Sequence, residues 1–109
     1  MGFVGAGDKI AADFNITKEV AGAHAGEVET SQILALAENL VEKERFQPGY
    51  LGVLGEEEIE MLFKKGMPSL TEIGVIGDPT KASKKRGKVY IERIVEFLTD
   101  EIKKGLLRE

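Results

Sequence analysis

A chain of 109 residues with 42% hydrophobic residues is long enough to bury one core, so we expect residues 1–109 to form a single domain. The absence of cysteine excludes disulfide bonds and thiolate metal sites. The net charge of −4 combines an acidic stretch, residues 1–80, with a basic one, residues 81–109. No apolar run reaches the roughly 20 residues of a membrane span, and the N-terminus lacks the basic region of a secretory signal. We therefore expect a cytoplasmic protein with no membrane partner.

The first 45 residues contain one clear helical pattern. Residues 8–14 predict a short helical turn, and the small residues 20–23 suit a backbone that packs closely against another segment. From Thr30 onward, apolar residues recur at helical spacing and predict a helix that ends near Arg45. Thr30 or Ser31 is the expected N-cap, because both side chains can accept a backbone hydrogen bond.

The middle of the chain alternates between turns and short elements. Residues 47–49 predict a stop and a turn, and residues 50–55 predict a loop or a short strand. Residues 56–65 predict a helix, because acidic residues begin the segment and lysines end it, which complements the helix dipole. Residues 70–76 then predict a strand or an extended segment.

The last third predicts one long helix. Asp78 can cap a helix, and Pro79 suits its first position. The apolar residues that follow form a single stripe at helical spacing: Val89, Ile91, Ile94, Val95, Leu98, Ile102 and Leu106. Gly87 lies inside this helix, where glycine costs about 1 kcal/mol relative to alanine. We therefore expect close packing or a helix break at Gly87.

The densest chemistry lies in residues 24–31, which hold the only histidine of the chain. His24 is followed by Glu27 and Glu29, and an imidazole beside a carboxylate is a common proton shuttle near neutral pH. A lone histidine is more often a structural or surface residue, and glutamates near a helix N-terminus often only complement its dipole. The small residues beside His24 favour the functional interpretation, because they leave room for a ligand.

Two other functions receive less support from the sequence. His24, Glu27 and Glu29 could supply at most three metal ligands, and their spacing is not a standard zinc signature. The basic residues between Lys81 and Lys88 could contact phosphates, but they have no interleaved aromatic residues. A solvated helix face explains this basic run better, and we expect no nucleic-acid partner.

Two segments resemble the creatininase (creatinine amidohydrolase) family. Residues 22–36, Gly-Ala-His-Ala-Gly-Glu-Val-Glu-Thr-Ser-Gln-Ile-Leu-Ala-Leu, are similar to the family segment that leads from a histidine into a helix. Residues 77–87 are similar to a later segment that opens the final long helix. The resemblance implies an α/β fold, part of a three-layer α/β/α sandwich, and this chain would form its C-terminal half. It also implies a metal-dependent amidohydrolase that is often hexameric.

The resemblance assigns roles to three residues and leaves a gap. His24 would carry the proton, Glu29 would orient His24 or the substrate, and Glu27 would lie behind them. The segments that supply most metal ligands in this family, an early Glu-x-His among them, are absent from the chain. Zinc, manganese or iron is therefore expected in a complete enzyme, and this chain alone would hold no complete metal site.

The sequence leads to one preferred function and one alternative. The preferred function is part of an enzyme that hydrolyses the C–N amide bond of a small cyclic or formyl amide. A partner chain would supply the metal-binding half, or the chain would self-associate, and the isolated chain would be inactive. The alternative is a non-catalytic homologue that serves as an assembly domain.

Overall fold

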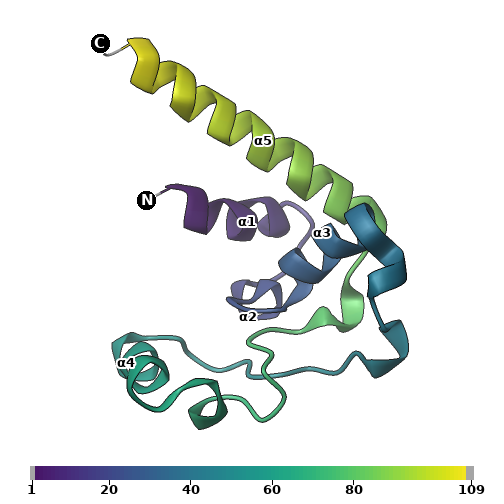
Figure 1. Ribbon diagram of the computed structural model, residues 1–109, viewed down its shortest axis with the longest axis vertical. Helices are drawn as coiled ribbons and strands as arrows, with labels where there is room; N and C mark the ends of the chain where they lie inside the picture. Colours follow the sequence, from purple (N-terminus) through teal and green to yellow (C-terminus); the bar gives the residue numbers. More distant parts are fainter. Residues whose placement is uncertain (1, 108–109) are drawn as a thin grey trace.

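The computed structural model describes residues 2–107 as a helical protein (Figure 1). Its α-helices are α1 (Gly2–Ala12), α2 (Lys18–Ala21), α3 (Glu27–Ala37), α4 (Glu56–Lys65) and α5 (Lys84–Leu107). Short 3-10 turns are η1 (Glu38–Leu40), η2 (Lys43–Arg45), η3 (Met67–Ser69) and η4 (Pro79–Lys81). Between residues 2 and 107 the extended segments form only isolated β-bridges, so the expected strand content of an α/β domain is not assembled here.

The core lies where α1, α2, α3 and the first half of α5 meet. Figure 1 shows α5 running diagonally across one side, with α1 and α3 against its N-terminal half and α4 at the far end of an extended arm. The buried apolar cluster consists of Ile10, Ala11, Ala21, Val28 and Tyr90. The ring of Phe14 packs edge-on against Tyr90 at a centroid distance of 6.2 Å. These contacts hold the segment 24–31 between α2 and α5.

The long C-terminal helix differs from its prediction in two respects. It begins at Lys84, because Asp78 and Pro79 open the short turn η4, in which the Asp78 carboxylate accepts the Thr80 backbone N–H at 2.9 Å. Only the start of the apolar stripe packs on the core, through Val89 and Ile94. The later stripe residues Val95, Leu98, Ile102 and Leu106 are exposed. Helical spacing indicates which face is apolar, but burial requires a neighbour.

The helix predicted for residues 30–45 is shorter and begins earlier. It starts at Glu27, with Gly26 at the N-cap, so Thr30 and Ser31 lie inside the helix. It ends at Ala37, whose backbone (φ −155°, ψ 64°) is no longer helical, and two 3-10 turns follow. The predicted N-cap and the predicted end are therefore both wrong.

Three segments distant in sequence meet at Ile76. Its N–H donates to the His24 carbonyl at 2.8 Å, and its carbonyl accepts the His24 N–H at 3.2 Å. Tyr50 forms a parallel bridge on the other side, where the Gly77 N–H donates to the Tyr50 carbonyl at 3.0 Å. Predicted extended segments 50–55 and 70–76 thus contribute one bridge residue each, and these bridges set the backbone position of His24.

Glycine makes this junction possible. Gly77 has φ 139°, and a Cβ there would lie 2.8 Å from the Cα atoms of both Gly22 and Gly26. A Cβ at Gly22 would lie 2.3 Å from the Ile76 carbonyl oxygen. The close backbone packing predicted for the small-residue segment is confirmed, although residues 18–21 form the single helical turn α2.

The helix predicted for residues 56–65 is confirmed as α4. The Glu58 carboxylate accepts the backbone N–H of the N-cap residue Gly55 at 2.8 Å. Gly66, with φ 82°, ends the helix as expected. Among the helices of residues 2–107, none combines the length and the apolar character that a bilayer crossing requires.

Candidate functional site

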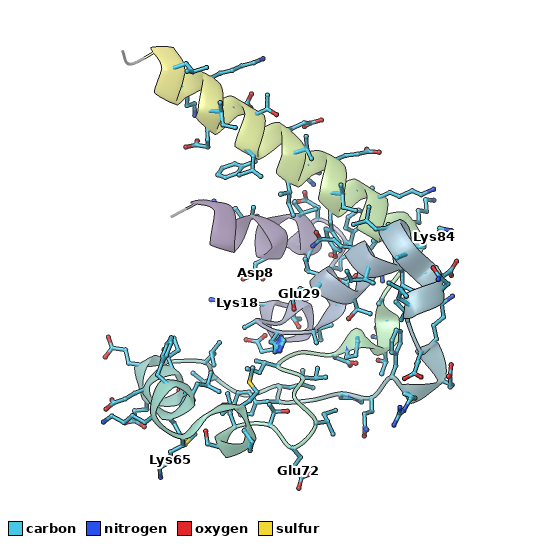
Figure 2. The ribbon with its side chains drawn as sticks, in the orientation of Figure 1. Asp8, Lys18, Glu29, Lys65, Glu72 and Lys84 are labelled. Carbon is cyan, nitrogen blue, oxygen red and sulfur yellow. The ribbon has the colours of Figure 1, made fainter. Side chains whose placement is uncertain are left out.

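His24 and Glu29 lie together at the entrance of α3. The His24 Nδ1 atom is 3.9 Å from the Glu29 Oε2 atom, and the two side chains are 52% and 57% exposed. The same carboxylate accepts the backbone N–H of Ala25. Figure 2 shows Glu29 near the centre of the view, above the two extended segments that lead to and from α4. Both side chains are accessible to solvent. The Glu29 carboxylate is held in place by the Ala25 N–H, which belongs to the same loop as His24.

The loop between His24 and α3 has an unusual backbone. Ala25 has φ 55°, in the left-handed region that costs a residue with a Cβ roughly 1 kcal/mol. The Thr30 hydroxyl donates to the Ala25 carbonyl at 3.3 Å, and Glu29 accepts the Ala25 N–H. First-turn side chains of α3 therefore hold this conformation, which aims the imidazole toward Glu29.

Glu27, the other sequence-predicted acid, lies in the interior. Its side chain is fully buried and receives three donors: the Ser31 hydroxyl at 2.9 Å, the Arg86 Nε–H at 2.9 Å, and the Tyr90 hydroxyl. Such a buried carboxylate is stable only when it is paired and hydrogen-bonded. Glu27 thus faces α5, whereas His24 and Glu29 face the surface.

The contacts of Glu27 continue between the two helices. The Ser31 hydroxyl, which donates to Glu27, accepts the Ser83 N–H at 2.9 Å. Arg86 also donates to the Lys81 carbonyl. We call Glu27, Ser31, Arg86 and Tyr90 the α3–α5 network. It joins the first two turns of α3 to the first two turns of α5, and so sets where the loop bearing His24 leaves the core.

Sequence reasoning missed two members of this network. Arg86 was assigned with its basic neighbours to a solvated helix face, but its side chain is only 25% exposed and is paired with Glu27. Tyr90 was left outside the apolar stripe, yet it is fully buried. The available signal was the spacing of Arg86 and Tyr90 by one helical turn, which puts a cation and a hydroxyl on one face.

The ionisation of Tyr90 provides a test of this burial. Desolvation, followed by the hydrogen bond to the Glu27 carboxylate, raises the pKa of Tyr90 well above its usual value. Above about pH 10 the unfolded chain ionises this tyrosine while the folded chain keeps its proton, so stability falls as pH rises. In urea titrations from pH 9 to 11.5, the free energy of unfolding should fall more steeply in the wild type than in Tyr90→Phe. Equal slopes would show that the phenol is solvated.

An open, mainly apolar groove begins at Glu29. Its volume is about 520 Å³, and it lies between α3 and the segment that contains η1 and η2. Its lining residues come from these two segments and from the His24 loop: Ala25, Glu29, Thr30, Gln32, Ile33, Leu36, Val41 and Phe46. The groove therefore connects directly with one member of the His24–Glu29 pair.

The described residues do not fit a metal ion by themselves. No group of three or more histidine, aspartate or glutamate side chains converges within the described part of the chain. His24 and Glu29 offer two donors, whereas a catalytic zinc takes three protein ligands. The described residues thus provide an imidazole and a carboxylate without a complete ligand set.

Comparisons with known proteins confirm the family resemblance. A family model described as "Creatininase: Creatinine amidohydrolase" matches residues 4–102. The "Mycofactocin precursor peptide peptidase" of Mycobacterium ulcerans (strain Agy99) is 32% identical over 80 residues, which cover 73% of this chain and 32% of that protein. The chain thus spans about a third of this curated relative's length. No solved structure matches. Because the family model covers most of the sequence, the chain belongs to the creatininase family.

Proposed function

We propose that this chain contributes the proton-transfer side of an amide-hydrolysing site. The observation that carries the proposal is the exposed His24–Glu29 pair, with 3.9 Å between Nδ1 and Oε2, inside the segment that the family model matches. Hydrolysis adds water to the amide carbon and breaks the C–N bond, and the leaving nitrogen needs a proton. His24 can carry that proton, and Glu29 can hold the imidazole in orientation.

The remainder of the site would come from outside these residues. The family is generally metal-dependent, and a zinc, manganese or iron ion would be held by another segment or another chain. That second part would also supply the strands of a three-layer α/β/α sandwich, next to the bridges at Ile76. Residues 1–109 would then be one domain that resembles the C-terminal half of the complete enzyme.

The substrate class is an amide of a small molecule or a short peptide. The family description, creatinine amidohydrolase, supports a small cyclic or formyl amide. The relative from Mycobacterium ulcerans is named as a peptidase of a precursor peptide, which supports a peptide bond. The same proton transfer to a leaving nitrogen serves both.

The test is hydrolysis by the chain purified with the polypeptides that assemble with it. The new amine group formed from a formyl amide, a cyclic amide or a short peptide is measured with added zinc or manganese. His24→Asn should lower kcat by about 10²–10⁴-fold, the usual share of general acid–base catalysis. Glu29→Gln should also lower kcat, whereas Glu57→Gln, on the exposed surface of α4, should not. Full activity in His24→Asn, with an unchanged circular dichroism spectrum, would refute the proposal.

The second candidate is a non-catalytic assembly domain, favoured by exposed apolar side chains. Leu40, Val53 and Phe63 are each more than 70% exposed, which is typical of surfaces covered by another subunit. This function predicts a homo-oligomer or hetero-oligomer whose mass in analytical ultracentrifugation is unchanged by His24→Asn. It also predicts that none of the three amides is hydrolysed.

A further inference from the structure

The groove beside Glu29 is positioned to hold part of the substrate. Glu29, Ile33 and Leu36 follow one another at helical spacing and so lie on one face of α3. Val41 and Phe46 form the other wall. A group bound between these walls would lie directly beside the carboxylate that is 3.9 Å from His24 Nδ1.

The lining selects for uncharged, apolar groups. The two neutral polar residues of the wall each donate one hydrogen bond within the chain: the Thr30 hydroxyl to the Ala25 carbonyl and the Gln32 amide to the Val28 carbonyl, each at 3.3 Å. No lysine or arginine is among the lining residues described, and Glu29 is the charged one. A carboxylate in the groove would meet the like charge of Glu29 and no lysine or arginine of the lining, whereas an apolar side chain would be desolvated favourably.

We propose that this groove binds an uncharged, bulky apolar side chain adjacent to the scissile amide. The volume of about 520 Å³ lies within the range of small-molecule sites and accommodates an aromatic or branched side chain with its flanking amides. The inference rests on the proposed function, and it narrows the substrate to an amide that carries such a side chain and no free carboxylate beside it. Leu36 is the specificity residue that it singles out.

The binding test uses three probes that differ in one property each. N-acetyl-phenylalaninamide is bulky and uncharged, N-acetylglycinamide lacks the side chain, and N-acetylphenylalanine carries a carboxylate. Binding to the full chain is followed by NMR shifts of the backbone amides of residues 29–46. Leu36→Gln and Leu40→Gln form a matched pair, because the two leucines are 71% and 73% exposed and only Leu36 lines the groove.

The expected result is saturable binding of the bulky uncharged probe, with little or none of the other two. Leu36→Gln should raise the Kd for that probe about tenfold, the effect of losing one apolar contact surface, and Leu40→Gln should leave it unchanged. Equal binding of all three probes, or equal effects of the two substitutions, would overturn the inference. Because binding is measured without hydrolysis, the probes can bind even if the proposed catalytic function is wrong, and the two failures can be told apart.

Another polypeptide segment is the rival occupant of the groove. In that case Leu36→Gln would lower the mass of the purified assembly, Leu40→Gln would not, and no probe would bind to the assembly. That outcome overturns the substrate assignment. With the assembled protein, a bulky uncharged amide should also be hydrolysed with a lower KM than its glycine analogue, and only Leu36→Gln should remove the difference.

Discussion

Replacing Glu27 with alanine is expected to lower the free energy of unfolding by about 3–5 kcal/mol. The substitution removes the acceptor of three donors and leaves the Arg86 guanidinium, only 25% exposed, without its ion-pair partner. It also leaves the buried Tyr90 hydroxyl without its acceptor. Since domains of this size are stable by only about 5–15 kcal/mol, urea denaturation followed by circular dichroism should show an early midpoint.

Two further variants distinguish the loss of the buried Glu27–Arg86 ion pair from the loss of a negative charge alone. Glu38→Ala removes an exposed carboxylate that pairs with Lys43 at 2.5 Å and with Lys84 at 3.4 Å, and exposed pairs contribute little to stability because water screens them. The double variant Glu27→Leu with Arg86→Met replaces the ion pair by apolar side chains and should recover part of the loss. A Glu27→Ala protein as stable as Glu38→Ala would contradict the buried position of Glu27.

Gly87→Ala is expected to destabilise the protein by about 2 kcal/mol or more, because it forces α3 and α5 apart. A Cβ at this position would lie 1.8 Å from the backbone carbonyl oxygen of Ser31 and 3.1 Å from the Ala35 Cβ. A backbone oxygen cannot swing aside as a flexible side chain can. The shift would also lengthen the bond from the Ser83 N–H to the Ser31 hydroxyl, now 2.9 Å. Thermal unfolding measures the loss.

The same substitution at Gly105 is the matched control. Both glycines lie in α5, but a Cβ at Gly105 would have no atom within 4 Å. Gly105→Ala should therefore stabilise the helix by up to about 1 kcal/mol, the difference in helix propensity between the two residues. Opposite signs at the two positions are the expected result. A neutral Gly87→Ala would show that the two helices are not in backbone contact.

Sequence patterns predicted correctly the element whose ends are stabilised by residues close to it in the chain. The helix at residues 56–65 was predicted in full, because its acidic start, its lysine end and Gly66 satisfy the helix termini from within the segment. The helix at α3 was misplaced at both ends, because its N-cap is Gly26, which offers no side-chain signal, and its end at Ala37 depends on neighbours. The same dependence leaves residues 70–76 with one bridging residue, Ile76, since a strand needs a partner along its length.

The amino-acid pattern alone identified the family and predicted the candidate site, because His24, Glu29 and the small residues between them lie within six positions of one another. Only the tertiary structure showed that Glu27 is buried and bonded to α5. Its acceptor faces Arg86 and Tyr90, 59 and 63 positions away, and no local pattern encodes such a pairing. A buried carboxylate needs hydrogen-bond donors, and two of those of Glu27 come from α5. The close backbone contact at Gly87 allows α5 to lie near enough to α3 to provide them.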